Sequence, residues 1–350
     1  MTTTHEVRAW GTTALGNSLE PVTITRRTMR DNDVRIRIEY AGICHSDIHT
    51  MYGDWGERQY PLVPGHEIVG IVEEVGSDVS KFKVGQRVGV GCFVNSCEQC
   101  EPCEAGEQGY CVNGVVATYG GTDKYTDGEY TQGGYSQEVI VQEHFVLNIP
   151  EAADAAATAP LLCAGITTYS PLKHWGAGPG KKVGIIGVGG LGHVGVKIAA
   201  ALGAEVIAFS QSDSKKDDAL KFGASRHVAS ADGLPEDLVH SLDLLINTVS
   251  ADLNMDEYLN LLAFNGTFVQ LGLPQDPMRI AARSLTQRRI SVAGSLVGGI
   301  PETQEMLDFC AEHGIGAEIE LIDAHYINEA YKRTVDSDVR YRFVIDAESF

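Results

Sequence analysis

A cluster of four cysteines is the strongest chemical signal in the sequence: Cys97, Cys100, Cys103 and Cys111. Four thiolates this close together can surround one tetrahedral zinc ion, a spacing that neither a disulfide ladder nor a redox pair uses. The surrounding segment, residues 91–135, is rich in Gly, Cys and Glu and shows no hydrophobic periodicity, so something other than a core must order it. We predict a closed structural zinc site, with an iron–sulfur cluster or free thiols as the alternatives.

A second set of potential ligands is dispersed along the chain: Cys44, His66, Glu67 and Cys163. Two thiolates and one imidazole, with a fourth position left open, form a catalytic zinc site. Spacing alone does not separate this hypothesis from simpler ones. A buried Cys163 is more often a small hydrophobic residue, and His66 after Pro64-Gly65 also suits an ordinary loop.

A glycine-rich turn occupies residues 187–192, with the sequence Gly187-Val188-Gly189-Gly190-Leu191-Gly192. It matches the G-x-G-x-x-G motif, follows an apolar strand and begins a helix, as a dinucleotide-binding turn requires. The glycines allow close approach of a pyrophosphate, which the helix N-terminus attracts. We predict a dinucleotide site, and a plain tight turn is the alternative.

The end of the next strand indicates which dinucleotide binds. NAD sites place Asp or Glu about 20 residues after the motif, where it binds the ribose 2′-hydroxyl. Here the position is Ser210, and Asp213 lies beyond the strand end, where we expect it to cap the following helix. Small hydroxyls and nearby lysines suit a 2′-phosphate, so NADP(H) is favoured. The candidate residues are Ser210, Gln211, Ser212, Lys215 and Lys216.

The elements that must position these groups change character along the chain. The first 150 residues are β-rich, with strands predicted at 34–38, 68–72 and 86–90. A helix is predicted at 152–160, and from Lys181 strands and helices alternate, which implies a parallel, doubly wound sheet. The expected strands are 183–187, 205–209, 242–246, 267–271 and 290–293, and the expected helices are 192–202 and 216–222.

The C-terminal segment returns to a mixed pattern. Residues 302–312 form an amphipathic helical pattern, and 341–345 indicate a final strand. We expect that strand to join the first domain, which the second domain would then interrupt.

Composition limits the function classes. The 350 residues suggest two domains, and a hydrophobic fraction of 43% excludes a disordered chain. The net charge of −20 argues against nucleic acid and anionic membranes as partners. Residues 1–6 show no export signal and no segment is apolar enough to cross a membrane, so we expect a cytoplasmic protein with reduced thiols. The eight cysteines then indicate metal binding, with Cys92 and Cys310 left over.

Together the motifs resemble the zinc-containing medium-chain dehydrogenase/reductase family. The resemblance extends over essentially the whole chain, through residues 42–49, Pro64–Glu67, the four-cysteine segment, residues 160–169 and the glycine turn. Residues 89–92, 210–216 and 341–344 resemble the cinnamyl-alcohol-dehydrogenase-like branch, and in particular bacterial NADP-dependent aldehyde reductases. The resemblance implies an α/β fold with a GroES-like β-rich catalytic domain (1–154 and 296–350) and a Rossmann domain (155–295), with cofactor and zinc held between them.

The resemblance also implies roles for individual residues. Cys44, His66 and Cys163 would bind the catalytic zinc, and Glu67 would approach the metal from behind and exchange with water or substrate. Asp47 would orient His66. Ser46 would contact the substrate oxygen and pass a proton, through the ribose of the cofactor, to His49.

Further assignments concern the cofactor, the substrate and the assembly. The cofactor would contact Thr167, the turn residues Gly187, Gly189, Gly190, Leu191 and Gly192, the Ser210–Lys216 segment, Thr248 and Arg342. Candidate walls of a substrate pocket are Trp55, Tyr119, Leu296 and Val297, for which ordinary core packing is an equal alternative. Residues 290–294 are expected to pair with a second copy, and the resemblance implies a homodimer, with a tetramer as the alternative.

The expected activity is reversible hydride transfer between NADPH and aromatic or aliphatic aldehydes, giving primary alcohols. One alternative is an NAD-linked polyol or secondary-alcohol dehydrogenase. Such enzymes usually have an acidic residue where this chain has Ser210, and polyol enzymes often lack a cysteine at the position of Cys163. Both residues therefore argue against this alternative. The other is a non-catalytic nucleotide-binding scaffold, which the intact ligand set and the acidic charge disfavour.

Overall fold

The chain leaves its first structural unit at Cys163 and returns to it at Gly298. A computed structural model describes residues 4–126 and 128–350, so residues 1–3 of the segment inspected for an export signal lie outside the described residues. The first unit extends to Cys163 and resumes at Gly298–Phe350, and the second unit is Ala164–Val297. Among the helices of the described ranges, none is both long and apolar enough to cross a membrane.

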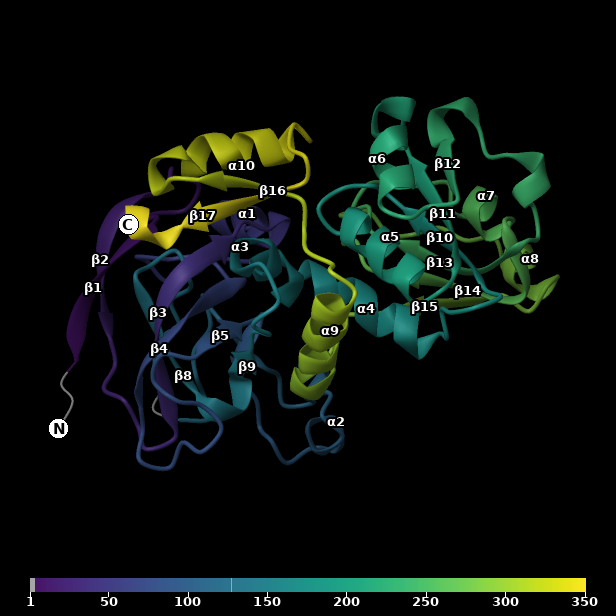
Figure 1. Cartoon of the computed structure of the whole chain (residues 1–350). Coiled ribbons are helices and arrows are strands. Elements are labelled where there is room, and N and C mark those ends of the chain that lie inside the picture. Colours follow the sequence, from purple (N-terminus) through teal and green to yellow (C-terminus); the bar gives the residue numbers. More distant parts are fainter. Residues whose placement is uncertain (1–3, 127) are drawn as a thin grey trace. The chain divides into compact units, whose positions relative to one another are not determined.

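A mainly antiparallel sheet forms the body of the first unit, in the order β16-β17-β3-β4-β5-β9, with β8 also paired to β3. Its strands are β3 (Asp33–Gly42), β4 (Ile68–Val75), β5 (Arg87–Val90), β8 (Glu138–Gln142), β9 (Leu147–Asn148), β16 (Ile319–Ile322) and β17 (Arg342–Asp346). The three strands predicted in this region are confirmed within β3, β4 and β5. The C-terminal β17, yellow in Figure 1, pairs antiparallel with β3 through Ile345 and Ala41. The prediction that the last strand returns to the first domain is therefore confirmed.

Smaller elements complete this unit. They are the paired strands β1 (His5–Gly11) and β2 (Glu20–Arg26), the paired strands β6 (Phe93–Asn95) and β7 (Val116–Ala117), and the helices α1 (His45–Tyr52), α2 (Glu101–Glu104), α3 (Ala155–Thr158), α9 (Ile300–Glu312) and α10 (Ile327–Val335). The predicted helix at 152–160 is only partly correct. After Asp154 caps α3, Pro160 breaks the α-helical pattern, and the chain continues as the 3-10 turn η3 (Ala159–Leu162).

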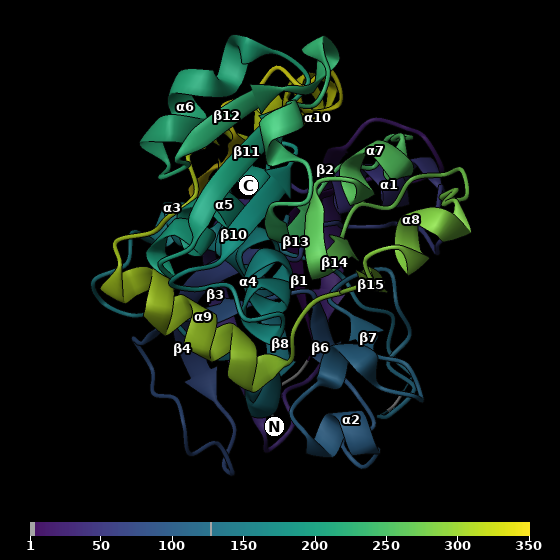
Figure 2. The ribbon, with the colours of Figure 1, turned by 90° about the vertical axis from the view of Figure 1, so that its right-hand side faces the viewer.

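The second unit is a parallel sheet in the order β12-β11-β10-β13-β14-β15, seen in Figure 2. Its strands are β10 (Lys182–Ile186), β11 (Glu205–Ser210), β12 (Arg226–Ala229), β13 (Leu242–Asn247), β14 (Leu262–Gln270) and β15 (Ser291–Gly294). Its helices are α4 (Ala164–His174), α5 (Gly192–Ala201), α6 (Lys216–Lys221), α7 (Met255–Leu259) and α8 (Ala282–Thr286). All five predicted strands are present, and side chains such as Phe209, Leu245 and Phe268 pack together in the core.

Candidate active site and metal centres

Four buried side chains gather in the first unit: Cys44, His66, Glu67 and Cys163, whose ligand atoms all lie within 4.8 Å of one another. Cys44 is the N-cap of α1, His66 and Glu67 directly precede β4, and Cys163 follows η3. The Cys44 and Cys163 sulfurs are 3.9 Å apart. Two sulfurs bound to one tetrahedral zinc at about 2.3 Å are separated by roughly 3.8 Å. The donor set and its spacing therefore fit a zinc ion.

Asp47 connects two of these ligands. Its Oδ1 lies 3.0 Å from His66 Nδ1, which leaves the Nε2 of that ring for a metal. Its Oδ2 accepts hydrogen bonds from the Cys44 backbone N–H at 2.9 Å and from the Tyr135 hydroxyl at 3.1 Å. Although burial acts in the opposite direction, this carboxylate raises the pKa of His66 well above its usual value. The negative charge of Asp47 also makes the His66 ring a stronger electron donor to a metal ion.

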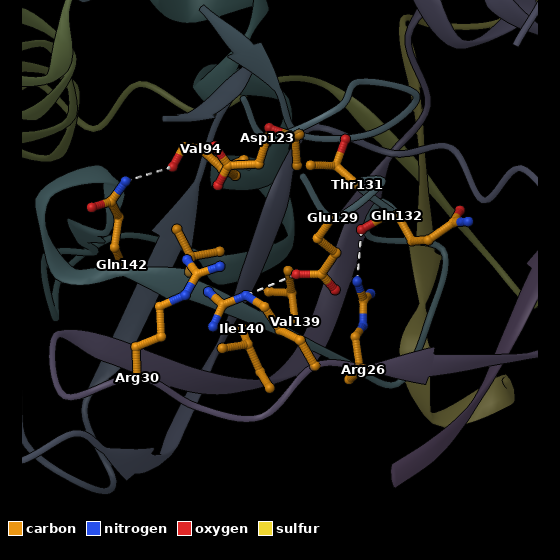
Figure 3. A pocket seen from close by; sticks show the side chains of 13 residues that line it. Arg26, Arg30, Val94, Asp123, Glu129, Thr131, Gln132, Val139, Ile140 and Gln142 are labelled. Atoms are coloured by element: carbon orange, nitrogen blue, oxygen red, sulfur yellow. Dashed lines mark hydrogen bonds and ion pairs between the residues drawn. The ribbon is translucent and has the colours of Figure 1, made fainter. Parts of the chain in front are cut away.

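A buried arginine, Arg26, contributes to this arrangement. Arg26 donates to the carbonyl oxygens of Gln132 and Gly133 at 2.8 and 3.0 Å and to the Ser136 hydroxyl at 2.7 Å, and Figure 3 shows its contact with Gln132. These acceptors flank Tyr135, the partner of Asp47. The pocket beside Arg26 offers about 40 Å³, which is room for water molecules only. We therefore regard Arg26 as a structural support for the segment that carries Tyr135.

Glu67 is paired with Arg342 in the interior. Arg342 Nη2 lies 2.5 and 2.6 Å from the two carboxylate oxygens and also donates to the Ile43 carbonyl at 2.7 Å. Burial raises the pKa of Glu67 to about 7, against the opposing charge of Arg342. Arg342, which the family resemblance associated with the cofactor, is thus 4% exposed and placed on β17 against Glu67.

Helix α1 carries the two residues expected to move a proton. Ser46 Oγ is 3.6 Å from Cys44 Sγ, and Ser46 and His49 are three residues apart, so they share a helical face. His49 Nδ1 contacts Asp54 Oδ2 at 2.7 Å, and its ring lies 5.2 Å from the Trp55 ring. Asp54 was not anticipated from the sequence. Its position after the helix, where α1 ends at Gly53 in a left-handed turn, is the signal that was available.

The four residues predicted to line a substrate pocket differ in burial and in the unit to which they belong. Tyr119 is buried and stacks on His66 with ring centroids 5.9 Å apart, whereas Trp55 is 42% exposed. Leu296 is exposed and Val297 half-buried, and both belong to the second unit, so the structure describes them separately from Trp55 and Tyr119.

The four-cysteine cluster is also assembled, with all four sulfurs within 4.8 Å of one another. Cys97 and Cys103 sulfurs are 4.0 Å apart and those of Cys100 and Cys111 are 3.9 Å apart, close to the edge of a zinc–sulfur tetrahedron. None of the eight cysteines, all of which lie in the described residues, forms a disulfide. Between Cys97 and Cys111 the regular elements are the short helix α2 and the 3-10 turn η1 (Gln108–Tyr110), so a zinc ion would supply further ordering there.

The glycine turn lies between β10 and α5. Gly187 has a φ of +91°, and a Cβ on Gly192 would lie 1.6 Å from the Gly187 carbonyl oxygen, so this tight turn requires both glycines. Thr248 Oγ1 donates to the Ile186 and Gly187 carbonyls at 2.8 and 3.1 Å and holds the turn in place. Gly189, Gly190 and Leu191 are half-buried, and Thr167 is buried on α4.

The predicted 2′-phosphate segment follows β11. Ser210 ends that strand, Gln211 and Ser212 follow, Lys215 lies in the 3-10 turn η4 (Asp213–Lys215) and Lys216 begins α6. The expectation that Asp213 caps α6 is wrong, because η4 intervenes and the N-cap is Lys215. Asp213 instead lies 3.4 Å from His227 Nδ1, and the other ring nitrogen of His227 contacts Ser210 Oγ at 2.6 Å. Sequence reasoning missed His227, since only strand pairing brings it here.

Two family models match the chain: the alcohol dehydrogenase GroES-like domain at residues 30–151 and the zinc-binding dehydrogenase at residues 190–312. NADP-dependent alcohol dehydrogenase C 1 of Mycolicibacterium smegmatis is 56% identical over 345 residues, which is 98% of each chain. Aldehyde reductase YahK of Escherichia coli is 51% identical over 97% of this chain and 98% of its own. The crystal structure of CAD from Helicobacter pylori complexed with NADP(H) matches with a TM-score of 0.93 and 42% identity, over 99% of this chain and 100% of that one.

These matches agree with a buried zinc-type ligand set in one unit and a dinucleotide turn in the other. The chain belongs to the zinc-containing medium-chain alcohol dehydrogenase/reductase family, in its cinnamyl-alcohol-dehydrogenase-like branch. The predicted GroES-like and Rossmann architecture is confirmed.

Proposed function

We propose that this chain is a zinc-dependent, NADP(H)-linked alcohol dehydrogenase that reduces aromatic or aliphatic aldehydes to primary alcohols and catalyses the reverse reaction. The observation that carries the proposal is the buried cluster of Cys44, His66, Glu67 and Cys163. Relatives named as NADP-dependent alcohol dehydrogenases and as an aldehyde reductase support the reaction class. The reduction consumes one hydride from NADPH and one proton, which bind the carbonyl carbon and oxygen respectively.

Cys44, His66 and Cys163 would hold the catalytic zinc. Glu67 would exchange with water or substrate as a further ligand of that ion. The bound zinc supplies a Lewis acid that polarises the carbonyl oxygen and lowers the pKa of the alcohol. Asp47 fixes the His66 ring so that Nε2 is the ligand nitrogen. Ser46 delivers the proton to the substrate oxygen, and His49, oriented by Asp54, exchanges it with solvent.

The Rossmann unit would bind the cofactor. The turn at Gly187–Gly192 offers backbone N–H groups at the start of α5 to the pyrophosphate. The hydroxyls after β11 and the two lysines at 215 and 216 would hold a 2′-phosphate, which supports NADP(H) over NAD(H). Cys97, Cys100, Cys103 and Cys111 would hold the second, structural zinc.

The direct test is the loss of absorbance at 340 nm when NADPH is mixed with benzaldehyde and a panel of aliphatic aldehydes. We expect turnover with NADPH well above that with NADH, and loss of turnover after a strong chelator. Cys44→Ser should abolish turnover and leave NADPH binding intact, with Cys310→Ser as the matched control. Undiminished turnover of a metal-free Cys44→Ser enzyme would refute the zinc mechanism. Faster oxidation of polyols with NAD would instead favour an NAD-linked polyol dehydrogenase.

We also propose that the enzyme works as a cytoplasmic homodimer. Within the part of the chain that the structure describes, the outer edge of β15 has no strand partner, which leaves its backbone groups available to a second copy. Size-exclusion chromatography with light scattering tests this, and a proline at Val292 should yield monomers.

A further inference from the structure

His227 is a buried histidine behind the proposed 2′-phosphate segment. Strand β12 pairs in parallel with β11, with His227 opposite Ala208, and this register places the imidazole under the end of β11. The side chain is fully buried. Its Nε2 lies 2.6 Å from Ser210 Oγ. A histidine here therefore contacts the first of the residues expected to distinguish NADP(H) from NAD(H).

The hydrogen-bond directions determine where the protons lie. Ser210 Oγ donates its single proton to the carbonyl oxygen of Ser212 at 2.8 Å. The hydroxyl must therefore accept from His227, so Nε2 carries a proton. In a neutral ring Nδ1 is then an unprotonated acceptor, yet it faces the Asp213 carboxylate at 3.4 Å. Among the described residues, this buried Nδ1 has no hydrogen-bond partner.

Protonation of His227 Nδ1 would remove the unfavourable contact between two acceptors, Nδ1 and the Asp213 carboxylate. Both ring nitrogens would then donate, one to Ser210 and the other to Asp213. The groups that face the ring are Ser210 from β11, Asp213 from η4 and Lys216 from the start of α6. Burial lowers the pKa of His227 below its usual value, Asp213 acts in the opposite direction, and Lys216 adds to the lowering. The lowered pKa of His227 favours the neutral ring in the free enzyme, and additional negative charge beside the ring would favour the imidazolium.

A 2′-phosphate supplies that negative charge. Its second ionisation has a pKa of about 6, so it is mainly a dianion at pH 7. Bound beside Ser210, it would also neutralise the field of Lys216, and both effects favour the charged imidazole. We propose that His227 is a positioning residue that determines cofactor specificity: it holds the Ser210 hydroxyl and takes up one proton from solvent, on Nδ1, when the 2′-phosphate of NADP(H) binds.

The proposal rests on the NADP(H) assignment of the preceding section and deepens it. Because binding would raise the pKa of His227, this residue should make the affinity for NADPH fall as the pH rises from the free-enzyme pKa to that of the complex. Each unit of that pKa difference corresponds to about a tenfold change in affinity. NADH, which lacks the phosphate, should show no such dependence.

Calorimetric titration of the zinc-loaded enzyme at pH 7, in buffers of different ionisation enthalpy, measures the proton directly. We expect wild type to take up a substantial fraction of a proton with NADPH and none with NADH. His227→Gln, which keeps a donor to Ser210, should lose this uptake and several-fold of the NADPH-over-NADH preference while its NADH affinity stays unchanged. His240→Gln, an exposed histidine of the same unit, should behave as wild type. Any proton released by the phosphate itself is common to all variants.

The outcomes separate the two proposals. Absence of uptake in wild type, or equal uptake in wild type and His227→Gln, would overturn the role of His227. A wild-type enzyme with no preference for NADPH would instead refute the cofactor assignment. If His227→Gln does not fold, Asp213→Asn at an exposed side chain provides the test. It should move the pH range of proton uptake downward, and an unchanged range would count against the proposal.

Discussion

Asp47 Oδ1 lies 3.0 Å from His66 Nδ1, and both side chains are buried. The second oxygen of the same carboxylate receives the Cys44 backbone N–H at 2.9 Å. One acidic side chain therefore orients two of the three proposed ligands of the catalytic zinc. This dual role distinguishes Asp47 from a simple helix cap on α1, and it leads to the first prediction.

Asp47→Asn should weaken zinc binding at the catalytic site by about 10- to 100-fold. The amide has one acceptor oxygen, so it cannot accept from His66 on one side and from Cys44 and Tyr135 on the other. Competition with a chromophoric chelator measures the affinity. The NADPH dissociation constant is the internal control, and an unchanged zinc affinity would contradict the proposed role.

Arg342→Met should destabilise the first unit by about 3–5 kcal/mol, because it leaves the buried Glu67 carboxylate without its partner. Glu67→Gln together with Arg342→Met should cost clearly less than the sum of the two single changes. Urea unfolding of the four proteins gives this double-mutant cycle. Additive effects would show that the pair is not coupled.

Cys100→Ser should reduce the zinc content from two ions per chain to one. The remaining three thiols cannot close a tetrahedral site, and the segment around α2 should then open at lower temperature. Elemental analysis and a thermal melt measure these effects. Cys310→Ala, a buried cysteine remote in sequence from both clusters, should retain both ions. A Cys100→Ser enzyme with two tightly held ions would exclude this ligand set.

His49→Gln should lower kcat for aldehyde reduction by roughly 10- to 100-fold, because the exchange of the proton with solvent loses its base. Added imidazole should restore part of the rate. The NADPH dissociation constant, measured in parallel, separates a loss of proton transfer from a loss of cofactor binding. Wild-type kcat in the variant would remove His49 from the mechanism.

Arg26→Lys should destabilise the protein by about 1–3 kcal/mol, since a lysine cannot serve the Gln132, Gly133 and Ser136 acceptors in the same geometry. Loosening of this segment should also weaken zinc binding through Tyr135 and Asp47. Arg226→Lys, at an exposed ion pair with Asp237, is the control and should change stability by less than about 0.5 kcal/mol. Equal effects of the two substitutions would show that Arg26 has no special supporting role.

Apolar runs and apolar–polar alternation in the sequence correctly predicted several strands of both units. The apolar runs of β10, β11 and β13 and the alternation within β3 lie where the sequence indicates. Strand β14 begins at Leu262, ahead of the predicted Thr267, because parallel pairing of Leu262 with Leu242 extends it. Tertiary pairing of this kind leaves no local periodicity.

The site divides in the same way. The four clustered cysteines are readable from spacing alone, whereas Cys44, His66 and Cys163 required the family resemblance. The resemblance also implied that Asp47 orients His66. The contacts of Tyr135 with Asp47, Arg342 with Glu67 and His227 with Ser210 were not predicted, because they form only through strand pairing or loop packing between distant segments. A single sequence carries chemistry in its residue types but does not record such contacts.

Strand β17 has a consequence for how the enzyme is made. The ribosome produces Cys44, His66 and Glu67 early, yet Arg342, which neutralises Glu67, lies in the final strand of the sheet. The whole Rossmann unit is synthesised in between. The Glu67–Arg342 pair can therefore form only after the Rossmann unit has been synthesised.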